Sequence, residues 1–387
     1  MPKVKSASKS DTKIDVRMDV VEYLCYFISP CLILFGVWQF DKTGTMFPLL
    51  WLIYALIPLL DYLTPLDLKN RTQEEYDVLE KDWRYNIPLY AIWAADAFMT
   101  IWAFNVIYYR SAELSYVELF IFTSTTAVAS GIGGAVGHEL FHRKEPIHIF
   151  FGTSFYFKML NMNFWIQHTQ GHHKNVATPI DPASAAQGQD VYSFSVKSIF
   201  YSFVDGWNIE ARRVNKAQPK TNAIIKILYN RVFWLKVLEW TLIGAILYFW
   251  DWKVALYFIA NAYAESFLLE VINYIEHYGL RRKEIAPGKY ERTTIRHSWN
   301  AAHRWTNAIL VKLQRHSDHH ENGYKPYQSL QTYDEAPQMP HGYSLMILLA
   351  LCPPLFKAIM DPFVDAYQNK HRPPTKEQMD TANKLVG

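Results

Sequence analysis

The chain has 387 residues, of which 50% are hydrophobic and 16% aromatic, and its formal net charge is only +3. This small charge gives no case for a nucleic-acid partner. The cysteines Cys25, Cys31 and Cys352 form no C-x-x-C pair, which excludes a disulfide framework and any cysteine-ligated zinc or iron–sulfur module within these residues. Residues 1–17 form a basic, polar tail without a cleavable signal pattern.

Six long apolar runs follow the tail, and each approaches the ~20 residues that a helix needs to cross the core of a bilayer. Short polar turns, such as 41–45 and 251–252, join the runs in pairs. We therefore predict an all-α membrane protein with six transmembrane helices in three hairpins. The runs cover about 20–40, 46–63, 87–109, 116–137, 233–250 and 253–274.

A few charged residues interrupt these runs. Carboxylates are costly in lipid, so we expect those within the runs to face the protein interior. A further apolar stretch, 343–360, is broken by Pro353 and Pro354, which predicts an interfacial or re-entrant helix rather than a seventh span. The acidic residues within the runs include Asp96, Glu118, Glu265 and Glu270.

Basic residues are unevenly distributed between the connections. The tail and the loop 64–86 are rich in lysine and arginine, whereas the opposite connections of the first four runs carry only Lys42 and Arg110. By the positive-inside rule, the tail and this loop lie in the cytoplasm, and the fourth helix ends there, just before His138.

This topology divides the chain into four parts. The second of them contains amphipathic segments, such as 191–204, whose pattern is typical of helices that lie along a membrane surface. The parts are 1–137 with the tail and the first four helices, 138–232 with cytoplasmic histidines, 233–275 with the last two helices, and 276–387 as a cytoplasmic histidine-rich cap.

The histidines carry the chemical signal. None of the fourteen occurs before residue 138, and nine of them form four compact groups. In the last group, His316, His319 and His320 are separated by three and one residues. On a helix this spacing places the three rings on one face, where they can converge on a common point. On the predicted topology all four groups reach the same cytoplasmic face. They are His138 and His142; His168, His172 and His173; His277; and His316, His319 and His320.

Nine imidazoles are too many for one ion, since a zinc site takes four ligands. They indicate two metal ions with four or five nitrogens each, and imidazole suits zinc, copper, iron and nickel equally. Nearby carboxylates are expected to accept the other ring N–H groups and to offset the positive charge. The candidates by position are Glu139, Asp181, Glu276 and Asp318.

Two other interpretations of these residues stay open. The first group matches the H-E-x-x-H signature of zinc metalloproteases, with Glu139 as the general base, although a protease would not need the other seven histidines. A non-enzymatic metal carrier would need a polar path through helices that contain few polar residues.

Of the remaining histidines, His297 and His303 could support the site, whereas His148, His341 and His371 are expected on the surface or in loops.

Four motifs together, HELFH, HTQGHH, NYIEHYGL and LQRHSDHH, resemble the membrane alkane 1-monooxygenases, or alkane ω-hydroxylases. The likeness extends over nearly the whole chain. Histidine boxes alone are shared across the wider superfamily of membrane di-iron hydroxylases and desaturases, including sterol and carotene hydroxylases. One departure is Gln167, where relatives often have glutamate before the second box.

The resemblance implies two non-haem iron ions held by all nine grouped histidines, with O₂ as co-substrate. One oxygen atom enters the terminal methyl group of a medium-chain n-alkane to give a 1-alkanol, and rubredoxin, reduced by rubredoxin reductase, supplies the electrons. It implies a bacterial inner-membrane enzyme with a cytoplasmic active site. A fatty-acyl desaturase is the main alternative, and it would form an alkene instead of an alcohol.

The chemistry of the substrate adds a structural expectation. An alkane offers no polar group for hydrogen bonding, so an enzyme has to orient it by shape, in an apolar tunnel that presents the methyl group to the metals. We expect this tunnel between the helices, with the second helix, 49–60, contributing to its wall.

Overall fold

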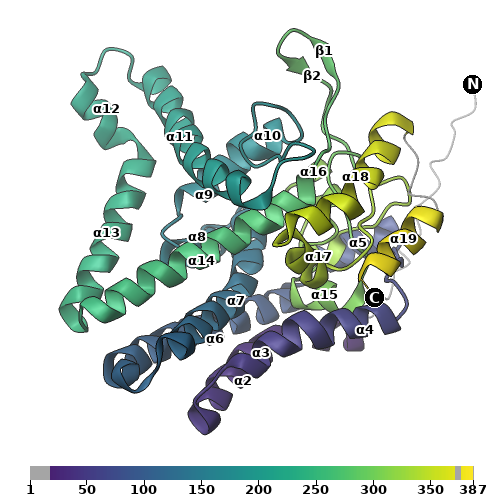
Figure 1. Ribbon diagram of the computed structural model, residues 1–387. Coiled ribbons are helices and arrows are strands. Elements are labelled where there is room, and N and C mark those ends of the chain that lie inside the picture. The colour runs from purple at the N-terminus through teal and green to yellow at the C-terminus, as the bar shows by residue number, and fades with distance from the viewer. Residues whose placement is uncertain (1–17, 371–375, 387) are drawn as a thin grey trace, which may run out of the picture.

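The structure is a computed structural model that describes residues 18–370 and 376–386. The basic tail 1–17 and His371 lie outside these residues. The described chain is mostly helical, with a single two-stranded antiparallel hairpin (Figure 1). This agrees with the predicted helical class.

The first half of the chain forms a series of long and short helices. They are α1 (Val20–Cys25), α2 (Ile28–Thr43), α3 (Phe47–Trp51), the π turn η1 (Leu52–Leu56), α4 (Ile57–Leu63), α5 (Gln73–Leu79), η2 (Trp83–Tyr85), α6 (Asn86–Arg110), η3 (Ser111–Glu113), α7 (Tyr116–Phe141), α8 (Pro146–Lys158), α9 (Asn163–Gln167), the π turn η4 (His168–His172) and α10 (His173–Asn175).

The second half contains the remaining helices and both strands. They are α11 (Val191–Ala217), α12 (Ala223–Tyr229), α13 (Arg231–Phe249), α14 (Trp252–His277), β1 (Glu284–Ala286), β2 (Lys289–Tyr290), α15 (Arg304–Ile309), α16 (His316–Glu321), η5 (Tyr327–Ser329), α17 (Tyr343–Ala350), α18 (Pro353–Lys370) and α19 (Lys376–Val386).

Within the described residues, five helical segments are long and apolar enough to cross a membrane. The second predicted run, Phe47–Leu63, is helical but shorter, and spans about 25 Å against a bilayer core of about 30 Å. Five of the six predicted spans are therefore confirmed by length and composition. They are Val20–Thr43, Trp83–Glu113, Tyr116–Phe141, Arg231–Phe249 and Trp252–His277.

The short apolar helix contains a π turn for a local reason. Pro58 follows directly after the start of α4, and a proline within a helix has no N–H and clashes with the carbonyl one turn earlier. Widening the preceding turn relieves this clash, and the N–H of Ile57 instead donates to the carbonyl of Leu52.

The acidic residues of the spans behave in two ways. Asp96, Glu265 and Glu270 are buried, as predicted. The expectation for Glu118 is wrong, because this residue is exposed and forms a capping box with Ser115 at the start of α7. Its carboxylate accepts the Ser115 N–H at 2.8 Å, so it stabilises the helix terminus instead of a contact between helices.

Lys158, the last residue of α8, compensates two of the buried carboxylates. Its Nζ lies 2.6 Å from Glu265 Oε2 and 3.3 Å from Asp96 Oδ1. Ser130 on α7 donates to Asp96 at 2.8 Å. This cluster links α6, α7, α8 and α14 through groups that would be unstable in lipid without one another.

The C-terminal elements pack on the bundle. The stretch 343–360 is divided into α17 and α18, with the break at Pro353 as predicted. Buried side chains of α17 pack against α14, η1 and α4. Asp61 near the end of α4 accepts the backbone N–H of Trp305 at 2.7 Å, which fixes α15 to the same end of the bundle.

We predict that Lys158→Met strongly destabilises the protein, because two carboxylates would remain buried without a cation. Breaking a buried ion pair costs about 3–5 kcal/mol, which thermal unfolding in detergent would detect as a lower melting temperature. Lys42→Met, which replaces an exposed lysine, is the matched control. Equal melting temperatures for the two variants would contradict the role assigned to Lys158.

Candidate metal centre

The end of α7 places the first two histidines. His138 and His142 are one helical turn apart, so their rings project from the same side. Helix α8 lies very close to this turn, since a Cβ at Gly137 would lie 2.9 Å from the carbonyl oxygen of Gly152. The two glycines allow the backbones to approach, which fixes the end of α7.

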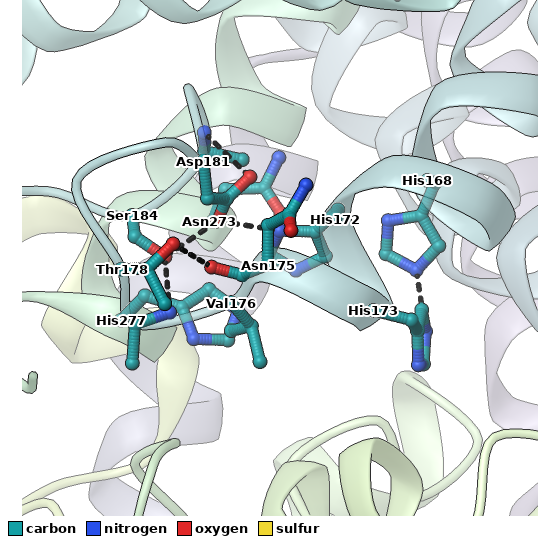
Figure 2. A network of polar contacts seen from close by, with 12 residues as sticks. His168, His172, His173, Asn175, Val176, Thr178, Asp181, Ser184, Asn273 and His277 are labelled. Carbon is teal, nitrogen blue, oxygen red and sulfur yellow. Dashed lines mark hydrogen bonds and ion pairs between the residues drawn. The ribbon is translucent and has the colours of Figure 1, made fainter. Parts of the chain in front are cut away.

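The second motif lies on a π turn rather than a regular α-helix. In η4 the N–H of His173 donates to the carbonyl of His168, so residues five apart, instead of four, come onto one side. As a result the Nε2 atoms of His168 and His173 lie 3.0 Å apart (Figure 2). His172 points to a different group of rings. Single π turns of this kind are frequent at functional sites.

Together the grouped histidines form two sets, each with ligand nitrogens within 4.8 Å of one another. The predicted convergence of the last motif on one point is therefore corrected: His319 belongs to one set, and His316 and His320 belong to the other. Site A comprises His138, His142, His168, His173 and His319, and site B comprises His172, His277, His316 and His320.

The distances within the sites fit metal coordination. In site A, His138 Nε2 lies 2.8 Å from His168 Nε2; in site B, His316 Nε2 lies 3.2 Å from His277 Nε2 and 3.0 Å from His320 Nε2. Two ligands at right angles on an ion with bonds of about 2.0–2.1 Å are about 3 Å apart. Both donor sets therefore fit a cation at their centre.

The environment keeps six of these imidazoles neutral. Burial, together with neighbouring histidines, lowers their pKa well below its usual value, and the neutral ring is the form that binds a metal. The rings concerned are His142, His168, His173, His316, His319 and His320.

Asp181 has the position expected of a supporting carboxylate. Its Oδ2 lies 2.8 Å from Nδ1 of His172, the ring nitrogen that faces away from site B (Figure 2). Ser184 Oγ donates to the same carboxylate at 2.5 Å. Such contacts fix the orientation of a ligand ring and make its other nitrogen a better donor. For His277, Ser298 Oγ lies 3.4 Å from Nδ1.

Glu276 takes a position that differs from the expected one. Its Oε2 lies 3.2 Å from Nε2 of His316, the nitrogen that faces site B, and Tyr343 donates to its Oε1 at 3.0 Å. The carboxylate therefore lies at the edge of site B, beside one ligand nitrogen, where its charge can partly neutralise a cation.

The hydrogen bonds that the structure describes for Glu139 and Asp318 go to groups other than the grouped histidines. Glu139 Oε1 pairs with Arg143 at 2.5 Å and accepts the Tyr327 N–H at 3.2 Å. Asp318 accepts from Lys325 and from the Gln331 N–H, both at 2.7 Å. Both carboxylates thus hold the segment 325–333 beside the histidines.

The other described histidines lie outside both sites. His297 accepts the Thr294 N–H at 2.9 Å, His303 and His341 line a separate cleft beside α4, and His148 contacts Tyr90 at 2.7 Å. The supporting roles of Ser184, Ser298 and Tyr343 have no signal in the sequence, because a serine or tyrosine has no distinctive spacing from the ring it contacts.

Comparison with known proteins identifies the family of the chain. Residues 114–349 match the fatty acid desaturase family. The chain is 34% identical to alkane 1-monooxygenase 2 of Pseudomonas aeruginosa, over 84% of this chain and 87% of the relative. It is 31% identical to alkane 1-monooxygenase 2 of Alcanivorax borkumensis, over 91% and 92%, and 30% identical to alkane 1-monooxygenase of Pseudomonas putida, over 88% and 84%. The chain belongs to the alkane 1-monooxygenase family of oxidoreductases.

Proposed function

We propose that this protein hydroxylates the terminal methyl group of medium-chain n-alkanes to give 1-alkanols, at two iron ions held in sites A and B. The observation that carries the proposal is the convergence of nine imidazoles, eight of them buried, in two adjacent donor sets, next to an apolar cavity. The names of the relatives support the substrate class.

The cavity lies between η1, α7, α14, α15 and α17. Its wall includes Tyr54 on η1, which supports a contribution of the second helix. Gly134 also lines it, and this residue precedes His138 by one helical turn. An alkane that enters end-on would therefore present its methyl group near site A, held by shape and dispersion alone.

The donor sets fit iron, which accepts histidine nitrogens. When bound, the two ions supply the reduction of O₂ and the oxidation of an unactivated C–H bond, which acid–base side chains cannot provide. The histidines position the ions, Asp181 orients the His172 ring, and the cavity wall excludes water from the substrate.

The membrane arrangement is part of the proposal. Five segments that can span a bilayer support six transmembrane helices in three hairpins, with Phe47–Leu63 as the short sixth. The charge asymmetry of the connections favours a bacterial inner-membrane orientation with the histidines at the cytoplasmic face. We retain the four-part division at residues 137, 232 and 275 on the same basis.

Electron supply from rubredoxin, itself reduced by rubredoxin reductase, is also proposed. A cleft of about 540 Å³ has His142 in its wall together with Lys81 and Lys144. His142 belongs to site A, so a carrier bound over this cleft would have a short path to the centre. The three scattered cysteines of the chain offer no internal carrier.

The main test is the product. Purified protein in detergent, with rubredoxin, its reductase and NADH, is expected to convert octane to 1-octanol, as measured by gas chromatography. Omitting rubredoxin is the control and should abolish turnover. Formation of octene would support a desaturase instead, and no reaction with any alkane of a length series would reject the proposed substrate class.

The two-site assignment predicts the metal content of variants. The wild-type protein is expected to hold about two iron ions per chain, and His277→Ala, which removes a site B ligand, about one. His303→Ala is the matched control, since this half-buried histidine lies outside both sites. Elemental analysis of the purified proteins measures this directly, and a single zinc ion per chain would rule out the di-iron proposal.

Cavity length predicts substrate length. Gly131 lines the cavity two helical turns from His138, about 10 Å away, and a Cβ there would meet only Leu268 at 3.7 Å. Gly131→Leu should block the cavity at this distance and reduce turnover of dodecane relative to octane by about tenfold or more. The control is Gly244→Leu on α13, where an added Cβ meets nothing within 4 Å. This variant should keep the wild-type ratio of dodecane to octane turnover. If both variants showed the same ratio, the substrate would lie outside this cavity.

A further inference from the structure

A buried polar face lies where α11 crosses α9 and α14. Most helix interfaces in this protein are apolar, yet Asn163, Gln167, Ser198, Ser202 and Glu270 are each at most 2% exposed. All five have side-chain polar atoms without a hydrogen-bond partner of good geometry among the described residues. A buried polar group left in this state costs about 1–3 kcal/mol, so five in one interface require an explanation.

These residues follow one another along α11. Ser198 and Ser202 are one turn apart on the same side of the helix, and Asp205 follows almost one turn later. The span from Ser198 to Asp205 is about 10 Å. At the crossing, Gly206 approaches the backbone of Asn163 and the Cβ of Gln167, so α9 crosses α11 one turn after Ser202.

The outer end of the row reaches the surface. The Asp205 side chain is 29% exposed and lies 4.0 Å from Arg212. Its inner side contacts Gln167, and partial burial raises the pKa of its carboxyl. A Cβ at Gly171 would lie 2.5 Å from Asp205 Oδ2, so the glycine of the second histidine motif makes room for this carboxylate.

The inner end of the row reaches the metal centre. Ser198 lies beside Glu270 on α14, in the electrostatic field of His172 and Asp181. Asn273 donates to Glu270 Oε2 at 3.3 Å, and Asn273 lies near His172 and Asp181 in Figure 2. The row therefore runs from a half-exposed carboxylate to the surroundings of a site B ligand.

We infer that this face is a water-filled proton path, in which Asp205 collects protons and Ser202, Ser198 and Glu270 pass them through ordered water to the metal centre. The inference rests on the proposed function. Buried water typically makes about three hydrogen bonds to polar groups that lack other partners, and the unpartnered amides and hydroxyls of this face provide them.

The reaction needs such a path. Hydroxylation breaks one C–H bond, forms one C–O bond and reduces the second oxygen atom of O₂ to water, which consumes two electrons and two protons. The electrons come from the carrier protein. The protons have to come from solvent, while the substrate side of the centre is apolar and dry. A separate polar route meets this requirement.

The first test needs no variant. A cryo-EM map of the wild-type protein that resolves ordered water elsewhere should show water between Ser198, Ser202 and Asn163. A dry interface in such a map would overturn the inference, whether or not the protein oxidises alkanes.

The second test uses turnover with a matched control. Glu270→Gln and Ser198→Ala should each lower kcat for octane by about tenfold or more and raise the solvent isotope effect in D₂O, with KM and iron content unchanged. Ser195→Ala is the control, because this buried serine on the same helix donates to its own backbone at Val191.

The outcomes separate the two proposals. If wild-type protein forms octanol and both variants match Ser195→Ala in kcat and isotope effect, the proton path is wrong while the function stands. If the variants lose iron along with activity, the residues stabilise the centre and the path is again overturned. If wild-type protein forms no alkanol, the proposed function fails, and the water map alone decides the nature of the polar face.

Discussion

The central constraint is the close approach of uncharged imidazole nitrogens. Nε2 atoms 2.8–3.2 Å apart in a buried space are close enough to share a proton in pairs or to bind one cation as a group, and the neutral ring is the form that binds a metal. The rings come from α7, η4, α10, α14 and α16, which are distant in sequence. Two cations would therefore cross-link the bundle to its C-terminal elements, and binding of metal would contribute directly to the stability of this end of the protein.

The spacing of the histidines in the sequence was enough to predict the nine candidate metal ligands, but not how they divide between sites A and B. The offset of four between His138 and His142 places both in site A, as a regular helix requires. The same rule applied to His168 would pair it with His172, whereas the π turn pairs it with His173. A π turn depends on what packs around it and has no reliable sequence signal. The division of ligands between the sites therefore could not be derived from the sequence.

Sequence proximity to histidines was a poor guide to the role of the acids. On a helix, adjacent residues point in different directions, so Glu139 and Asp318 face away from the rings beside them and hold the segment 325–333. Asp181, nine residues from its histidine, makes the expected contact, because a loop can turn back in a way that a helix cannot. The exposed Glu118 illustrates the same limit, since an apolar run alone does not reveal a helix cap.

Helix α14 separates the two environments that the chemistry needs. Leu268 and Ile272, one turn apart, face the apolar cavity, while Glu270 and Asn273 lie on another side of the helix and face the polar row of α11. At its end, His277 enters site B. A hydrocarbon and a chain of water cannot share one channel, because each would displace the other. Placing them on different faces of one helix lets both reach the same centre, and it accounts for Glu270 in a segment that is apolar enough to span a membrane.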